Sequence, residues 1–193
     1  ASKRQGSRYA ASSLKGMFIS MNRIVLNKNE LYQGLLLLVN AKHPYRAETK
    51  KRLSALDWTT AHILLDFRAA ALLNHLLRQI RSGNDIIPVS GYRSKREQEK
   101  IYNGSMKDNG AEFTQKYVAL PGHSEHQTGL AIDLALYMDQ IDFICPEFPE
   151  EGICKIFRKY APRYGFIERY QKAKEAVTGI SHEPWHFRYV GYP

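Results

Sequence analysis

Cysteine is scarce in this sequence, with Cys145 and Cys154 as the only two. Two thiols cannot build a four-cysteine zinc site, so a structural metal centre of that kind is excluded. Whether the two form a disulfide stays open, because cysteine spacing alone does not decide pairing. The small count fits a cytosolic chain, and it also fits many secreted bacterial enzymes.

Long apolar runs are missing as well. The leucine-rich run Leu35–Val39 is far shorter than the roughly 18 residues that a membrane-spanning helix needs. It does not fit the apolar part of a signal peptide, since Gln33 and Gly34 precede it and no small-residue cleavage pattern follows. The absence of a signal peptide favours a cytoplasmic location. Because the first residue is not Met, an anchor that was removed from before it is an open alternative.

Acidic residues are outnumbered, with 19 Asp and Glu against 28 Lys and Arg, which gives a formal net charge of +9. Such a balance suits an anionic partner, either nucleic acid, a wall polymer or a substrate that carries a carboxylate. Most basic residues are scattered, and none form a run with aromatic residues on a predicted helix. We therefore expect no nucleic-acid binding.

A chain of 193 residues is long enough for one domain with a substantial core. Residues 1–17 are rich in Ser, Gly, Lys and Arg without periodicity, so we expect a loosely ordered leader followed by a single domain over 18–193. Two short apolar runs within residues 24–39 predict a strand or hairpin. Apolar residues at helical spacing predict a helix over Asp57–Arg81, which Gly83 ends.

The remaining pattern alternates short helices with short strands. Ser94 and Glu97 form a capping box that predicts a helix from Lys95 towards Asn103, which Gly104 ends. Further helices are expected at 111–117 and 152–160, and strands at 86–90, 130–136, 165–170 and 186–190. This order predicts an α+β fold with a mostly antiparallel central sheet.

Two distant segments carry candidate metal ligands. Asp133 interrupts the apolar run at 130–136, and a buried carboxylate needs a partner, of which a metal is the strongest available. With His126 and His186 it makes a three-ligand set for one Zn²⁺ ion that leaves the fourth position open, as catalytic sites do. Pro184 directs Glu183 away from helical geometry, so the zincin helix motif does not apply.

Two further residues have roles expected from this chemistry. Glu183 is the candidate general base, which would take a proton from the attacking water and pass it to the leaving amine. The alternative is that Glu183 only orients a metal ligand. Arg93 follows a predicted strand, where a fixed guanidinium can stabilise the developing oxyanion, and a surface salt bridge is the alternative.

Four ordered motifs between about Ile86 and Gly191 resemble a known family. They are Ser90-Gly91-Tyr92-Arg93-Ser94 with Gln98, Val118-Ala119-Leu120-Pro121-Gly122, Ser124-x-His126-x-x-Gly129-x-Ala131-x-Asp133, and Glu183-Pro184-Trp185-His186-x-Arg188. Together they resemble the zinc D-alanyl-D-alanine carboxypeptidases and dipeptidases of the VanY and VanXY type. These belong to the LAS metallopeptidases, which are related to the hedgehog and lysostaphin folds.

The resemblance implies a zinc D,D-carboxypeptidase, with D,D-dipeptidase activity left open. Its partners would be peptidoglycan precursor peptides that end in D-Ala-D-Ala, the target of glycopeptide antibiotics such as vancomycin, and no protein partner is implied. The VanXY-type proteins are expected to act in the cytoplasm.

The family also implies substrate contacts. Gln98 and Ser124 match positions that hold the substrate backbone and its terminal carboxylate, with plain capping or turn roles as the alternative. Ser90 stands where VanXY-type enzymes have aspartate, which favours carboxypeptidase over dipeptidase activity. Tyr117 and Trp185 are expected to wall the pocket, although aromatic residues near strands often belong to the core.

Two other functions stay open. An L,D-carboxypeptidase or a peptidoglycan endopeptidase can use the same zinc motifs. A zinc-stabilised binding module without catalysis is the alternative from another class, and the intact Glu183 and Arg93 argue against it.

Overall fold

The computed structural model describes residues 25, 27–46, 51–56 and 63–191, and every structural statement below refers to these residues. The leader expected over 1–17 and the part of the expected helix at 57–62 lie outside them. The division into a leader and one domain over 18–193 therefore stays a prediction. None of the described helices is long and apolar enough to cross a bilayer.

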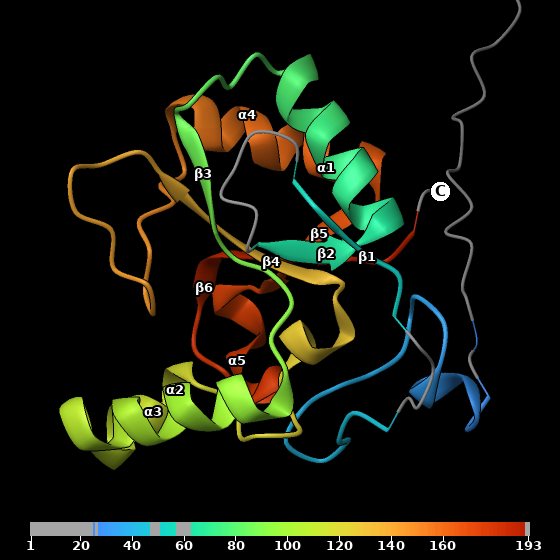
Figure 1. Ribbon diagram of the computed structural model, residues 1–193, viewed down its shortest axis with the longest axis vertical. Helices are drawn as coiled ribbons and strands as arrows, with labels where there is room; N and C mark the ends of the chain where they lie inside the picture. Colours follow the sequence, from blue (N-terminus) through green and yellow to red (C-terminus); the bar gives the residue numbers. More distant parts are fainter. Residues whose placement is uncertain (1–24, 26, 47–50, 57–62, 192–193) are drawn as a thin grey trace, which may run out of the picture.

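A four-stranded antiparallel sheet forms the centre of the molecule (Figure 1). Its strands are, in spatial order, β3 (Ile86–Ser90), β4 (Ala131–Leu136), β6 (Glu183–Tyr189) and β5 (Phe166–Tyr170). The inner strands β4 and β6 bury nearly all of their side chains, which explains why apolar residues are continuous in β4 instead of alternating. All four predicted strands are confirmed, and β6 begins three residues earlier than expected.

Helices lie on both sides of this sheet. In Figure 1, α1 (Phe67–Gln79) and α4 (Gly152–Tyr160) lie at the top, whereas α2 (Lys95–Asp108) and α3 (Gly110–Tyr117) lie at the bottom. Edge-to-face contacts among Phe148, Phe157 and Phe187 join α4 and its preceding loop to β6, with ring centroids 4.8 to 5.7 Å apart. The α+β fold with an antiparallel sheet is thus confirmed.

The prediction of a helix over 57–81 is wrong for residues 63–66, the first ones of that range that the structure describes. Leu64–Asp66 form strand β2, which pairs antiparallel with β1 (Leu53–Ala55), and the helix starts only at Phe67. The backbone of β2 has distant partners, because the Asp66 N–H donates to the Gly129 carbonyl at 2.7 Å and the Leu64 carbonyl accepts from Tyr92 at 2.6 Å. The Asp66 carboxylate then caps the helix by accepting the Arg68 N–H.

The strand or hairpin expected within residues 24–39 is also wrong for the part that the structure describes. This part contains the short 3₁₀ helix η1 (Glu30–Tyr32) and no strand. The carbonyls of Leu35 and Leu37 accept hydrogen bonds from the Arg188 guanidinium, each at 3.0 Å, where a strand would have used backbone donors. Helix α2 differs too, since it passes through Gly104 and ends at Asp108.

Candidate active site

The three expected metal ligands come from neighbouring elements and meet in the interior. His126 lies in the 3₁₀ turn η2 (Glu125–Thr128), Asp133 lies in β4, and His186 lies directly opposite Asp133 in β6. Gly129 ends η2 at φ +75°, and a Cβ there would lie 2.9 Å from Leu53 Cδ2. Glycine therefore lets the turn reverse into β4 and lets β1 pack against it.

The hydrogen bonds of the two imidazoles fix which nitrogens face Asp133. His126 Nδ1 must donate to the Gly91 carbonyl at 2.7 Å, which leaves Nε2 towards Asp133 Oδ2 at 3.0 Å. His186 Nε2 faces the Glu125 carboxylate at 3.3 Å, which leaves Nδ1 towards Asp133 Oδ1 at 2.9 Å. In each case an imidazole nitrogen without a proton faces a carboxylate oxygen of Asp133, and such a pair needs a proton or a cation between its two acceptors. One metal ion bound by all three residues satisfies both pairs.

The donor set fits Zn²⁺. Ligand atoms of His126, Asp133 and His186 all lie within 4.8 Å of one another, and all three residues are buried. Burial opposes ionisation of Asp133, but the two imidazoles outweigh it and hold the pKa of this carboxyl below its usual range. An ionised carboxylate with two imidazole nitrogens is a typical set of ligands for catalytic zinc.

Glu183 lies beside this cluster at the start of β6. Its Oε2 is 3.7 Å from His186 Nδ1, and its side chain is 8% exposed. Burial raises the pKa of Glu183 to about 8, with Asp133 and Glu125 adding to the rise while His186 and Arg93 oppose it. A carboxyl group with a pKa near neutrality can both accept and return a proton.

Arg93 reaches the cluster from the loop after β3. Its guanidinium Nη2 lies 3.6 Å from Asp133 Oδ2, and its Nε has no hydrogen-bond partner. The loop is held closely, because a Cβ on Gly91 would clash with the Leu64 carbonyl and the Arg93 N–H donates to the His126 carbonyl at 3.2 Å. A fixed cation with an unused donor therefore faces the cavity.

All five expected substrate-contact residues line one cavity of about 390 Å³ together with the cluster. They are Ser90, Gln98, Tyr117, Ser124 and Trp185. Gln98 already donates its amide nitrogen to the Ala119 carbonyl at 2.7 Å, so its free atom is the acceptor Oε1, which is buried without a partner. The Ser124 hydroxyl accepts the His126 N–H at 3.3 Å and keeps its own proton for another partner.

Sequence reasoning missed the role of Glu125. One oxygen of this buried carboxylate forms ion pairs with Arg169 Nε at 2.9 Å and Arg188 Nη1 at 3.1 Å. The other oxygen faces His186 Nε2. Burial opposes ionisation of Glu125, but Arg188, His186 and Arg169 outweigh it and hold its pKa at about 2. No pattern in the sequence around Ser124 and His126 predicts that the glutamate between them is buried.

Two cavity-lining residues also went unrecognised. Tyr170 packs its ring 4.8 Å from that of His186, and Phe143 lines the cavity from a loop where it is 77% exposed. Neither belongs to a motif.

Comparison with known proteins agrees with this geometry. Residues 62–192 match the family VanY, described as D-alanyl-D-alanine carboxypeptidase. A bifunctional D-Ala-D-Ala dipeptidase and carboxypeptidase, VanXYC of Enterococcus gallinarum, is 41% identical over 160 residues, which cover 82% of this chain and 84% of that protein.

Solved structures agree as well. The vancomycin resistance D,D-dipeptidase VanXYg, in complex with a D-Ala-D-Ala phosphinate analogue, is 58% identical with a TM-score of 0.83, covering 87% of this chain and 67% of that one. The D,D-pentapeptidase VanY E175A mutant from the VanB-type resistance cassette, in complex with Zn(II), is 32% identical with a TM-score of 0.63, covering 81% and 88%.

Proposed function

Because the chain belongs to the VanY family of D-alanyl-D-alanine carboxypeptidases, we propose that it is a zinc-dependent D,D-carboxypeptidase that releases the terminal D-alanine from peptides ending in D-Ala-D-Ala. The observation that carries the proposal is the meeting of His126, Asp133 and His186 with Glu183 and Arg93 on one cavity. Such peptides are peptidoglycan precursors, so their hydrolysis would remove the target of glycopeptide antibiotics.

His126, Asp133 and His186 would hold the metal. When bound, Zn²⁺ supplies a Lewis acid for the substrate carbonyl and makes a water nucleophilic near neutral pH. Glu183 would take the proton of the attacking water and deliver it to the amine of the leaving D-alanine. Its position beside His186 and its raised pKa support both transfers.

Three side chains would orient the substrate. Arg93, with an unused donor, suits the oxygen on which negative charge develops. The free acceptor of Gln98 suits a substrate N–H, because its Oε1 is buried without a partner. The free hydroxyl proton of Ser124 suits the terminal carboxylate.

Ser90 supports a preference for longer peptides over the free dipeptide. It lies opposite Asp133 in the pairing of β3 with β4 and lines the cavity. A dipeptide brings its ammonium group close to the reacting bond, and a neutral serine cannot pair with that charge. A pentapeptide carries an amide there, which needs no charged partner.

Substitution of the proposed base tests the function. We expect Glu183→Gln to keep zinc, measured by metal analysis, and to lose D-alanine release from a stem pentapeptide by at least about 10²-fold. A chelator should abolish release by the unchanged enzyme, and Glu99→Gln, an exposed residue of α2, should retain full activity. Hydrolysis by zinc-loaded Glu183→Gln at the original rate would refute the assignment.

The cytoplasmic location expected from the sequence stays a prediction. Immunoblotting of cytoplasmic, membrane and extracellular fractions of cells that express the natural gene tests it.

A further inference from the structure

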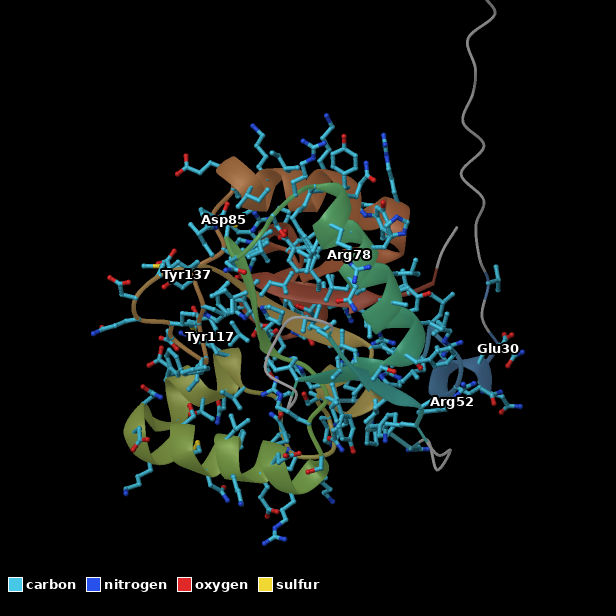
Figure 2. All side chains as sticks on the ribbon, turned by 45° about the horizontal axis from the view of Figure 1, so that its top comes forward. Glu30, Arg52, Arg78, Asp85, Tyr117 and Tyr137 are labelled. Carbon is cyan, nitrogen blue, oxygen red and sulfur yellow. The ribbon has the colours of Figure 1, made fainter. Side chains whose placement is uncertain are left out.

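A second hollow lies apart from the catalytic cavity. It is a groove of about 1030 Å³ that shares no described lining residue with the cavity. We call it the basic groove and define it by Tyr32, Tyr45, Arg46, Lys51, Arg52 and Phe67. In Figure 2, Arg52 lies beside η1 and far from Tyr117, which lines the catalytic cavity.

Among the described residues that line the basic groove, positive charges outnumber negative ones. No carboxylate among the described residues lies within the 4.0 Å ion-pair distance of Arg46, Lys51 or Arg52. Arg68 also lines the groove, but Asp66 neutralises it through contacts of 3.0 and 3.1 Å. A hollow lined by charge of one sign focuses its field and raises the local concentration of ions of the opposite sign.

Aromatic rings hold each of these cations in place. The Arg46 guanidinium lies 4.7 Å from the Tyr32 ring centroid, and the Arg52 guanidinium lies 4.3 Å from that of Phe67. Lys51 Nζ lies 4.8 Å from the Tyr45 ring and 5.2 Å from the Tyr92 ring. A side chain that is already ordered loses less conformational entropy when it binds a ligand.

The backbone beneath these residues is anchored to the catalytic domain. The Arg52 carbonyl accepts the Phe67 N–H at 2.9 Å, and the Tyr45 N–H donates to the Gly122 carbonyl at 2.8 Å. Thr128 and Leu130, which flank the turn after His126, form part of the groove wall. Backbone hydrogen bonds therefore tie Tyr45 and Arg52 to the body of the protein, and the cations lie over aromatic rings.

We propose that the basic groove binds a ligand with at least two neighbouring phosphate groups. A single carboxylate is satisfied by one guanidinium, whereas three ordered cations match the several oxygens and higher charge of a diphosphate. The ligand could come from two sources with the same chemistry, a diphosphate joined to the pentapeptide substrate or a separate phosphate polymer. Binding itself does not depend on hydrolysis in the catalytic cavity.

The direct test is calorimetric titration of the zinc-loaded protein with inorganic pyrophosphate, with zinc content checked afterwards. We expect the triple variant Arg46→Gln, Lys51→Gln, Arg52→Gln to bind about tenfold more weakly or worse, because three charge-assisted contacts are lost. Raising the salt concentration should weaken binding to the unchanged protein. No binding to the unchanged protein, or equal binding to the triple variant, would overturn the proposal.

A matched control removes three cations elsewhere. Lys155, Lys159 and Arg163 are exposed, and the last two also lie over an aromatic ring, that of Tyr160. Their replacement by Gln lowers the net charge equally, so pyrophosphate affinity should change by less than about twofold if the basic groove is the site. Equal loss in both triple variants would show a general charge effect and would also overturn the proposal.

Kinetics then separate the two sources. With the diphosphate of the substrate as ligand, KM is lower for a pentapeptide joined to a sugar diphosphate than for the free pentapeptide, and the triple variant removes this difference. With a separate polymer as ligand, the two KM values are equal while a soluble polyphosphate binds to the basic groove. D-alanine release from the free pentapeptide should be unchanged in the triple variant.

Discussion

At the scale of single residues, Glu125 determines which face of His186 is available to a metal. One oxygen of its carboxylate forms ion pairs with Arg169 and Arg188, and the other faces His186 Nε2. His186 therefore presents Nδ1 to Asp133. Carboxylates in this position fix the ring orientation and raise the basicity of the ligand.

We predict that Glu125→Gln weakens zinc binding by about 10- to 100-fold, because the amide keeps the shape but lacks the charge. Competition with a chromophoric chelator measures the dissociation constant. The exposed Glu99→Gln variant should bind zinc as the unchanged protein does. An unchanged zinc affinity in Glu125→Gln would show that Glu125 serves packing alone.

The same residue should affect stability in acid. Folding lowers the pKa of Glu125 from 4.5 to about 2, so its contribution to stability is complete above pH 4.5 and is lost as the pH falls through 2. Glu125→Gln lacks this contribution, and its urea midpoint should therefore fall less between pH 5 and pH 2.5 than that of the unchanged protein. Parallel acid dependence in both proteins would contradict the low pKa.

Ser90 gives a prediction about substrate choice. Ser90→Asp places a carboxylate on the cavity wall, where it can pair with the ammonium group of free D-Ala-D-Ala. We expect kcat/KM for the dipeptide to rise by about tenfold relative to the pentapeptide. Ser90→Asn has the same shape without the charge and should leave the ratio unchanged, and an equal rise in both variants would argue against charge pairing.

At the scale of elements, the start of α2 positions Gln98. The Ser94 hydroxyl accepts the Glu97 N–H at 3.2 Å, and the Glu97 carboxylate accepts the Ser94 N–H at 2.7 Å. We predict that Ser94→Ala lowers the free energy of unfolding by about 1 kcal/mol in urea titration and raises KM. Lys95→Ala alters the next residue without breaking the cap. It should change neither the free energy of unfolding nor KM.

The capping box of α2 could be read from the sequence because both of its partners are local. The start of α1 could not, since Leu64–Asp66 fit a helical pattern and become a strand through pairing with β1 and bonds to Gly129 and Tyr92. The residues around Leu35 and Leu37 were misjudged for a similar reason, because their partner is the distant side chain of Arg188.

The candidate site divides in the same way. The three candidate metal ligands and Glu183 lie in short motifs, so their roles could be predicted from the sequence. Glu125 acquires its surroundings from Arg169 and Arg188, and the basic groove brings η1, the segment around Lys51 and the start of α1 together. Neither arrangement has a local pattern, so only the tertiary structure shows them.

At the scale of the whole molecule, the segment before β1 packs into the same core as the central sheet. Leu37 and Val39 are buried in the main core, and the carbonyls of Leu35 and Leu37 bind the guanidinium that also holds Glu125. This segment precedes the residues that match the family, which begin at residue 62.

We predict that a chain beginning at residue 47 loses about 4 kcal/mol or more of unfolding free energy relative to one beginning at residue 25. Burial of two aliphatic side chains accounts for roughly 1.5–3 kcal/mol each, and Arg188 loses two acceptors besides. Urea titration and zinc affinity of the two proteins measure the effect. Equal stability and equal zinc affinity would show that the segment is dispensable.

The bonds from Arg188 to Leu35 and Leu37 also bear on the order of folding. They join residues 153 and 151 positions apart, and the sheet order β3-β4-β6-β5 adds further distant pairings. Contacts that enclose so much chain form slowly, because loop closure comes before any gain from the contact. Glu125, which supports His186, is itself bound by Arg188, so we expect this support to form late in folding. The moment at which a refolding chain first captures zinc should then mark the completion of its native topology.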